Sequence, residues 1–250
     1  MKKIVKITRV LGITIALVGY INIHIQAQNN CLNFDGSNDY VACSPINPTN
    51  FTLEAWIKPE NTSADQAIIS TLSTSTSTGC ELHIGANNTV TLTIKNTSGW
   101  LDVVSPSDVI TNSDWTHIAA TYNGTTTVVY VNGISVASQT ESSYYKGSNN
   151  LCIGSRSSGS LFFDGSIENC RVWSRALSQA EIQDNLYATL DGSETGLLCF
   201  YKFNQGTANG SNYGITTATD ATANGNNGTL SGFALSGTSS NWVSGLKDKP

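Results

Sequence analysis

The stretch from Asp114 to Val136, DWTHIAATYNGTTTVVYVNGISV, decides the fold of this chain. Apolar and polar residues alternate through three short runs, and Asn123-Gly124 and Asn132-Gly133 separate them. Asn-Gly accepts the positive φ of a tight hairpin turn, so the pattern predicts three antiparallel strands with a tight second turn and a longer, threonine-rich first one. Three strands cannot stand alone, because one face still has to be buried. We therefore expect the rest of the chain to supply a second apolar surface.

The remaining sequence predicts more strands and one helix. Apolar residues occupy every second position from Phe51 to Ile57, which is the period of a β-strand, and Pro59 ends that run. The helix signal is a capping box formed by Ser178 and Glu181, which predicts a helix ending near Leu186 or Leu190. Leu177 and Ile182 have the spacing of a hydrophobic staple. These patterns predict an all-β, two-sheet antiparallel jelly-roll sandwich with one short helix.

The first 28 residues have the pattern of a secretory signal peptide. Four basic residues precede a mostly apolar run from Val10 to Ile25, and Ala27-Gln28 leads into a polar start. An uncleaved membrane anchor is the alternative, although the run is short and contains Asn22 and His24. We expect residues 1–28 to be removed, leaving one domain over 29–250 that is secreted or held at the cell surface without membrane insertion.

The net charge of the chain excludes some classes of binding partner. The chain has 13 Lys+Arg and 18 Asp+Glu, and the predicted leader holds four of the basic residues and none of the acidic ones. The mature chain is then clearly acidic and has no basic cluster. This balance argues against nucleic acid and anionic membranes as partners.

The six cysteines could form disulfides or be buried as free thiols. All of them follow the predicted leader, and export permits disulfides, so we expect at least one bridge whose pairing the sequence does not choose. Several also sit within apolar runs, which is typical of buried small apolar residues. No Cys-x-x-Cys occurs, which disfavours a thiolate zinc site. The cysteines are Cys31, Cys43, Cys80, Cys152, Cys170 and Cys199.

Several segments resemble laminin-G-like domains of the concanavalin A-like lectin/glucanase superfamily. The resemblance covers about 32–243, and the C-terminal motif joins a Gly-x-Ile strand to the predicted helix. The motifs are Phe34-Asp35-Gly36-x-x-Asp39-Tyr40-Val41, Trp115-x-His117-x-Ala119-x-Thr121-Tyr122-x-Gly124, Tyr130-Val131-Asn132-Gly133 and Gly165-x-Ile167-x-x-x-x-x-Trp173. The resemblance implies a jelly roll and a carbohydrate or surface glycoconjugate as ligand.

The superfamily includes glycoside hydrolases, which cleave glycosidic bonds with a pair of carboxylates. Retaining hydrolysis needs two carboxylates roughly 5–5.5 Å apart. Same-face carboxylates on one strand would appear as Glu-x-Asp-x-(x)-Glu, and no such run exists; Glu54 and Glu168 stand alone on their strands. His83 and His117 have no evident nucleophile beside them, and we interpret them as structural. We expect no enzymatic activity, and a hydrolase with a rearranged site is the alternative.

The resemblance also implies calcium, which is frequent in this superfamily. Ca²⁺ is bound by oxygen ligands in loops that mix carboxylates with carbonyls. Asp35-Gly36 and Asp164-Gly165 are acid-plus-glycine turns at predicted strand ends, and Asp39 or Asp220 could add a ligand. Asx turns that need no ion explain the same residues equally simply.

For sugar binding, exposed aromatic residues would stack on pyranose rings. The candidates are Trp100, beside Gly99 at a loop-to-strand junction, and the pair Tyr144 and Tyr145 between two strands. Core packing for Trp100 and a solvated loop for the tyrosines are the structural alternatives. Trp56, Trp115 and Trp173 fall inside strand motifs and are expected in the core.

Three functions remain open at this point. The first is a secreted, non-catalytic, lectin-like or adhesive domain that binds carbohydrate. The second is a structural module of a cell-surface assembly that contacts other surface proteins. The third is the rearranged glycoside hydrolase.

Overall fold

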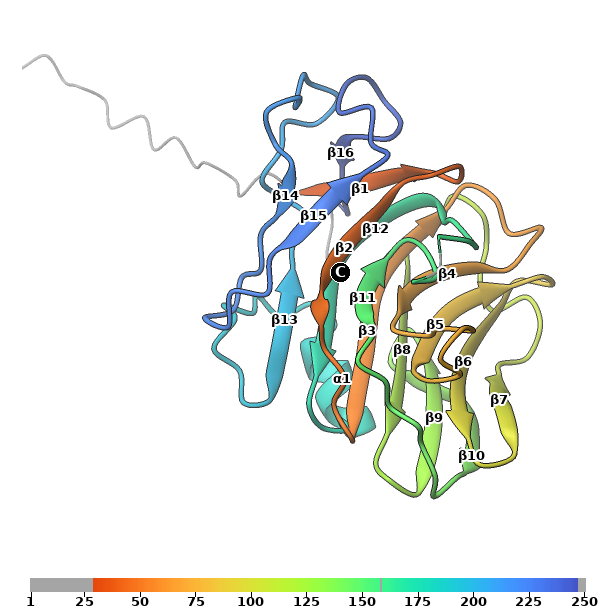
Figure 1. Cartoon of the computed structure of the whole chain (residues 1–250). Helices are drawn as coiled ribbons and strands as arrows, with labels where there is room; N and C mark the ends of the chain where they lie inside the picture. The colour runs from red at the N-terminus through yellow and green to blue at the C-terminus, as the bar shows by residue number, and fades with distance from the viewer. Residues whose placement is uncertain (1–28, 158, 247–250) are drawn as a thin grey trace, which may run out of the picture.

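Two antiparallel sheets packed face to face form the structure, which is a computed structural model describing residues 29–157 and 159–246 (Figure 1). The predicted signal peptide, residues 1–28, lies outside the described residues. Sheet A has the order β10 (Ile134–Thr140), β9 (Thr126–Val131), β8 (Thr116–Tyr122), β3 (Phe51–Pro59), β12 (Asp164–Trp173), β1 (Asn30–Asp35) and β16 (Trp242–Ser244), and β13 (Leu197–Tyr201) also pairs with β12. Sheet B has the order β14 (Thr217–Ala218), β15 (Gly228–Ser231), β2 (Tyr40–Pro45), β11 (Asn150–Ile153), β4 (Gln66–Ser70), β5 (Cys80–Gly85), β6 (Thr89–Asn96) and β7 (Gly99–Val104). The predicted two-sheet sandwich is confirmed.

The meander from Asp114 to Val136 forms as its turns predict. Asn132 and Gly133 have φ of 49° and 75°, the two positive values that a I′ turn needs between β9 and β10. In the longer first turn, the Asn123 side chain accepts hydrogen bonds from the backbone N–H groups of Thr125 and Thr126 at 3.0 and 2.8 Å. Local chemistry therefore sets the register of β8, β9 and β10.

The main core lies between the sheets, and every second side chain of a strand points into it. On β5, Leu82 and Ile84 are fully buried in the core, while Glu81 and His83 belong to the opposite face of sheet B. The same alternation continues on β6 and β7, where Leu92 and Val103 are core residues. The outer face of sheet B is consequently polar.

A second, smaller core covers the outer face of sheet A. Helix α1 (Gln179–Asn185) packs there through its buried residue Ile182, which belongs to the same apolar cluster as Trp173. The predicted capping box is present: Glu181 N donates to Ser178 Oγ at 3.3 Å, and Ser178 N donates to Glu181 Oε2 at 2.8 Å. The helix ends at Asn185, close to the nearer of the two expected ends. In the described part of the chain, no helix has the length and apolarity needed to cross a bilayer.

Two expectations need correction. The disulfide does not form: all six cysteines are free and buried, so the reading as small core residues holds instead. The segment 204–228, for which no strand was predicted, contributes the two-residue β14 and the first residue of β15. A strand as short as β14 carries too little periodicity to be recognised in sequence.

Candidate functional site

A row of polar side chains crosses the outer face of sheet B. Ser70, Glu81, Thr93 and Asp102 lie directly opposite one another on β4, β5, β6 and β7. Opposed residues in neighbouring antiparallel strands share a face, so the four side chains form one line. Ser70 Oγ donates to Glu81 Oε2 at 2.8 Å, and Thr93 Oγ1 donates to Asp102 Oδ1 at 2.6 Å. We call these four residues the polar row.

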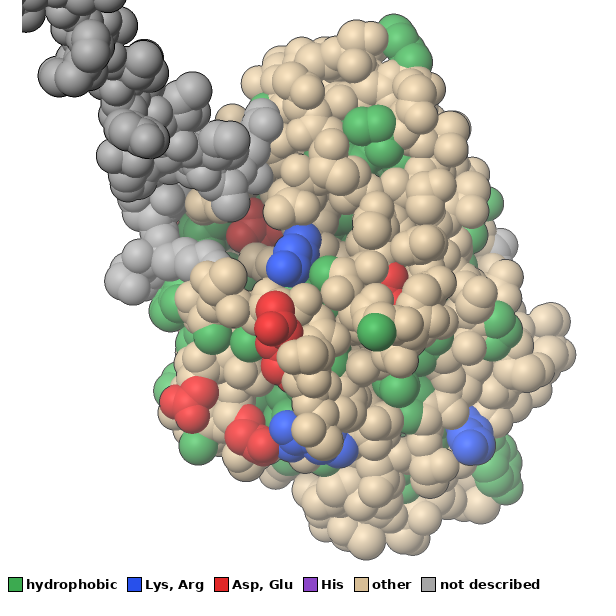
Figure 2. Space-filling view, turned by 90° about the vertical axis from the view of Figure 1, so that its left-hand side faces the viewer, with side chains coloured by type: hydrophobic (Ala, Val, Ile, Leu, Met, Phe, Trp, Pro, Cys, Tyr) green, Lys and Arg blue, Asp and Glu red, His purple; other side chains and the backbone are tan. Residues whose placement is uncertain are grey.

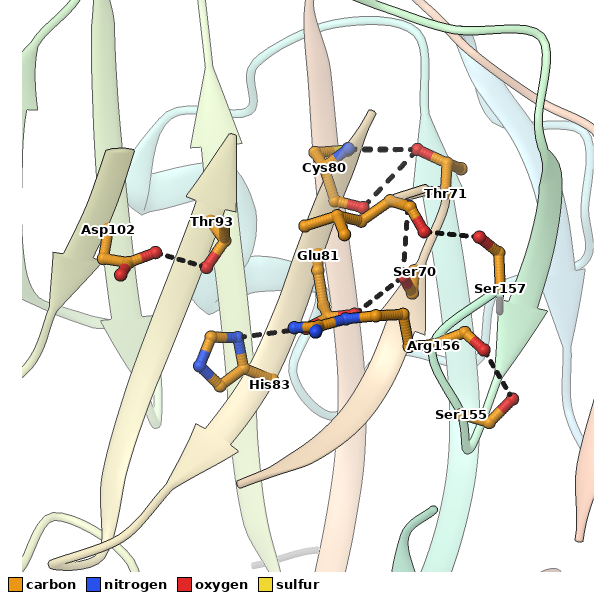
Figure 3. A network of polar contacts seen from close by, with 11 residues as sticks. Ser70, Thr71, Cys80, Glu81, His83, Thr93, Asp102, Ser155, Arg156 and Ser157 are labelled. Carbon is orange, nitrogen blue, oxygen red and sulfur yellow. Dashed lines mark hydrogen bonds and ion pairs between the residues drawn. The ribbon is translucent and has the colours of Figure 1, made fainter. Parts of the chain in front are cut away.

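Arg156 reaches over the polar row from the segment after β11 (Figure 3). Its Nε donates to Glu81 Oε2 at 3.0 Å and its Nη2 donates to Glu81 Oε1 at 2.6 Å, which is a two-point ion pair. Hydrogen bonding to Glu81 raises the pKa of Arg156 above its usual value. Glu81 is fully buried, so Arg156 neutralises a charge that water does not reach.

His83 follows Glu81 on the same face of β5 and is 8% exposed. Its Nδ1 lies 3.6 Å from Glu81 Oε1 and has no hydrogen-bond partner. Burial lowers the pKa of His83, and this outweighs the nearby carboxylates. His83 is therefore an uncharged imidazole at neutral pH.

These side chains surround a hollow of about 240 Å³ on the outer face of sheet B. That volume is below the roughly 300–1,000 Å³ of pockets that enclose a drug-sized ligand, so the hollow suits a small part of a larger molecule. Trp100 is 41% exposed and Val104 48%, on either side of Asp102 along β7. An exposed indole beside hydroxyl, carboxylate and imidazole groups can stack on a sugar ring and bond its hydroxyls. The hollow is lined by Asp65, Leu72, Thr74, His83, Thr93, Trp100, Asp102 and Arg156.

The structure separates the three predicted ligand-binding aromatics. Trp100 lines the hollow. Tyr145 is 46% exposed but is not one of the lining residues. Tyr144 packs against the main core, where its ring centroid lies 5.5 Å from that of Phe51 and 5.6 Å from that of Tyr122. Tyr144 therefore does not present its ring to a ligand, because the apolar end of the sandwich takes it up.

The predicted calcium residues meet at one end of sheet A. Asp35 and Asp164 are opposed across β1 and β12. Asp35 Oδ1 accepts the Ser37 N–H at 2.9 Å, which is an Asx turn, and a Cβ on Gly36 would lie 2.9 Å from Asp164 Cβ. Burial, and then Glu60 and Asp35, raise the pKa of Asp164.

The two additional acidic candidates have other roles. Asp39 is buried and accepts the Asp35 N–H at 3.0 Å, and burial raises its pKa to about 6. Asp220 organises its loop by accepting the N–H groups of Phe200, Thr222 and Asn226. Within 29–157 and 159–246, no three His, Cys, Asp or Glu side chains are grouped to hold a metal ion. Asp35, Asp39 and Asp220 accept hydrogen bonds from backbone N–H groups, and calcium stays a prediction from the resemblance.

The other buried polar cluster belongs to the second core. Glu54 is fully buried; its Oε1 accepts from Arg171 Nη1 at 3.1 Å and from Trp173 Nε1 at 2.9 Å, and its Oε2 lies 3.3 Å from His117 Nε2. Burial alone would raise the pKa of Glu54, but these three partners lower it to about 2. Trp56 covers the cluster by donating to Leu186 O at 3.2 Å. Because α1 closes this site, its role is structural.

A second hollow lies beside the end of β13, where Phe200 and Lys202 line it. It measures about 170 Å³, and Glu168 and Lys202 contribute to its wall beside Asn29. Its aromatic member, Phe200, is 2% exposed and is therefore closed to stacking. On the face that Figure 2 shows, hydrophobic side chains are scattered among polar ones and do not form one continuous patch. The hollow beside Trp100 is the better candidate site.

Sequence reasoning found one residue of this site and missed the others. Alternation identified the strands that carry His83 and Asp102, but it did not indicate that β5 and β7 lie on either side of β6 in one sheet. Arg156 lies in an irregular segment with no recognisable motif. The signal available was the polar face of three successive runs, in which Glu81-x-His83, Thr91-x-Thr93 and Trp100-x-Asp102 alternate with apolar residues.

Comparison with solved structures agrees with this fold. A Bacteroides ovatus protein to which carbohydrate binding is attributed matches with a TM-score of 0.63 and 24% identity, over 82% of this chain and 58% of its own. The CBM40 domain of the Ruminococcus gnavus IT-sialidase, bound to α2,3-sialyllactose, matches with a TM-score of 0.52 and 17% identity, over 62% and 94% of the two chains. Domain 4 of AbnA, a GH43 extracellular arabinanase from Geobacillus stearothermophilus in complex with arabinotriose, matches with a TM-score of 0.50 and 20% identity, over 62% and 75%. This chain thus spans 58% of the Bacteroides ovatus protein.

Sequence comparison identifies the family. No relative among curated proteins matches the chain. The family model Laminin_G_3, described as the concanavalin A-like lectin/glucanases superfamily, matches residues 35–183. That range is more than half of the 250 residues and contains β2 to β12, including every residue of the hollow beside Trp100. The chain therefore belongs to the Laminin_G_3 family of the concanavalin A-like lectin/glucanase superfamily.

Proposed function

We propose that this protein is an exported, non-catalytic domain that binds carbohydrate on the outer face of sheet B. The observation that carries the proposal is Trp100, a 41% exposed indole at the edge of a polar hollow. An exposed indole beside hydrogen-bonding groups offers a ligand an apolar face and polar partners at the same place.

The chemistry of the hollow suits a sugar. One face of a pyranose ring is apolar and stacks on an indole, while its hydroxyls need donors and acceptors around the rim. Asp102 keeps Oδ2 free when Oδ1 accepts from Thr93, and the imidazole of His83 is uncharged. The Ruminococcus gnavus and Geobacillus stearothermophilus domains, which share the fold, are described with bound oligosaccharides, and this supports the same class of ligand here.

Two of the buried carboxylates, Glu81 and Glu54, are poorly placed for hydrolysis. Both oxygens of Glu81 are held by Arg156, and one also accepts from Ser70. Glu54 has a pKa of about 2 and lies beneath α1, so it cannot carry a proton to a leaving group at neutral pH. Export, an adhesive role at the cell surface and a possible requirement for calcium belong to the same proposal and rest on the signal-peptide pattern and the family resemblance.

The test is binding of residues 29–250 to a glycan and polysaccharide array, with calcium and with EDTA. Binding that Trp100→Ala weakens by roughly tenfold or more, with the melting temperature unchanged, supports the proposal. Tyr213→Ala is the matched control, because Tyr213 is 66% exposed and lies outside the hollow. Binding lost in EDTA would add calcium to the mechanism. No binding to any glycan would overturn the proposal and favour contact with other surface proteins.

A further inference from the structure

The hollow beside Trp100 carries an excess of negative charge. Asp65 and Asp102 are exposed carboxylates on its wall, and the carboxylate of Glu81 lies beneath it. Arg156 is the one cation among the lining residues, and His83 is neutral because burial lowers its pKa. Three carboxylates against one guanidinium leave two negative charges facing a ligand at neutral pH.

Arg156 turns the Nε and Nη2 side of its guanidinium to Glu81, whose charge it offsets. A guanidinium usually binds an anionic sugar through two parallel N–H groups, and here Nε and Nη2 point at Glu81 at 3.0 and 2.6 Å. Turning that fork outward would leave Glu81 fully buried and unpaired, which is strongly unfavourable. Arg156 therefore serves as the permanent partner of Glu81.

The nearest other cation lies beyond the hollow. Lys95 is opposite Trp100 on β6, with its Nζ 5.6 Å from the centre of the indole ring, and it donates to Asn96 O at 3.2 Å. It is not a lining residue. Lys95 therefore contacts the indole of Trp100 but is not part of the wall that carries Asp65 and Asp102.

We infer that this site selects uncharged glycans and rejects those that carry carboxylates or sulfates. The inference rests on the proposed carbohydrate function and adds the class of sugar. Asp65 and Asp102 accept hydrogen bonds from neutral hydroxyls, whereas an anionic group in the same place meets two negative charges, because the charge of Arg156 is already balanced by Glu81. The discrimination is electrostatic and weakens with added salt.

The test compares neutral with acidic polysaccharides on the same purified chain. The neutral probes are arabinan, galactan, mannan and xylan, and the acidic ones are polygalacturonate, hyaluronan and heparin. Carboxyl-reduced polygalacturonate and hyaluronan serve as uncharged matches of their parents. We expect acidic probes to bind roughly tenfold or more weakly than neutral ones, and carboxyl reduction to restore binding.

Charge variants locate the effect. Asp102→Asn should raise the ratio of acidic to neutral binding by roughly three- to tenfold, because it removes one of the two opposing charges. Asp184→Asn is the matched control: it makes the same change in net charge on exposed α1, which covers the other sheet, and should leave the ratio unchanged.

The outcomes separate the two proposals. Acidic probes that bind as well as, or better than, neutral ones overturn the selectivity and leave the carbohydrate function standing. An equal response to Asp102→Asn and Asp184→Asn overturns the placement of the selectivity at this hollow. Failure of every glycan to bind overturns the proposed function, and the selectivity falls with it.

Discussion

Glu81 and Arg156 lie 75 positions apart in the chain and join in a two-point ion pair, with Nη2 to Oε1 at 2.6 Å and Nε to Oε2 at 3.0 Å. Glu81 is fully buried, while the Arg156 side chain is 23% exposed. The pair ties the segment after β11 to the polar row of sheet B. It also sets the net charge of the candidate site, because Arg156 is the one cation that lines the hollow and its charge is balanced by Glu81.

Removal of Arg156 should destabilise the protein more than removal of a surface arginine. Arg156→Met leaves Glu81 buried without a counter-charge, and we expect a loss of about 3 kcal/mol in urea unfolding. Arg175→Met is the control, because Arg175 pairs with Glu181 at 2.6 Å but both side chains are about 40% exposed. That variant should lose less than about 1 kcal/mol. Similar losses in the two variants would contradict the account of Arg156.

Glu54 should make stability fall in acid. Its partners hold its pKa at about 2, well below the ordinary value of 4.5 for a glutamate. A carboxylate with a lowered folded-state pKa stabilises the protein above its unfolded pKa, and this contribution is lost as the pH falls from about 4.5 through 2. The contribution corresponds to about 3 kcal/mol.

Urea unfolding at pH 6, 4.5, 3 and 2 checks this expectation on the wild type and on Glu54→Gln. The variant should be less stable at pH 6, because Arg171 loses its counter-charge, and its stability should depend less on pH across the same range. Parallel pH profiles for the two proteins would show that Glu54 is not the group responsible.

The thiols should be reduced and unreactive. Burial raises the pKa of Cys31 and Cys43 to about 12 and that of Cys152 to about 11, so little thiolate exists at pH 8. Ellman's reagent should detect none of the six thiols in the folded protein and all six in guanidinium chloride. Fewer than six after denaturation, restored by prior reduction, would show that a disulfide does form.

Gly133 should tolerate a side chain less well than a glycine in open space. Gly133→Ala meets a positive φ and also places Cβ 2.9 Å from Gln183 Cγ and 3.0 Å from Leu186 Cδ1. Gly225→Ala meets a similar φ of 71° with nothing within 4 Å. An alanine at a positive φ is strained, and this strain lowers the stability of both variants by about 1–2 kcal/mol.

We therefore expect Gly133→Ala to be the more destabilising by about 1 kcal/mol, since overpacking against α1 adds to the backbone strain. Chemical unfolding of the two variants beside the wild type measures the difference. Equal losses would mean that α1 moves away from the turn freely.

Much of the sandwich could be predicted because its signals are local. Asn132-Gly133 accepts the dihedral angles of its turn, and Ser178 with Glu181 begins α1 without help from distant residues. Alternation on β5 and β6 separates core from outer face. The disulfide expectation failed because spacing along the chain does not report distance or geometry: all six cysteines are buried as free thiols, and Cys43, Cys170 and Cys199 share the main core without a bond between them.

The candidate site was only partly visible in the sequence. Trp100 could be singled out as an aromatic residue at a strand junction, but Tyr144 had the same local character and is packed into the core. Exposure is set by which surfaces meet when the sheets close. That is a property of the whole fold, which no short window of sequence contains.

The sequence by itself determined the strands, their turns, the helix start and the family, because these depend on residues a few positions apart. Only the tertiary structure decided that Ser70, Glu81, Thr93 and Asp102 form one row and that Arg156 closes over it. Strand order and loop path bring these groups together from across 87 positions. Their charges and partners depend on distances that exist only once both sheets have packed.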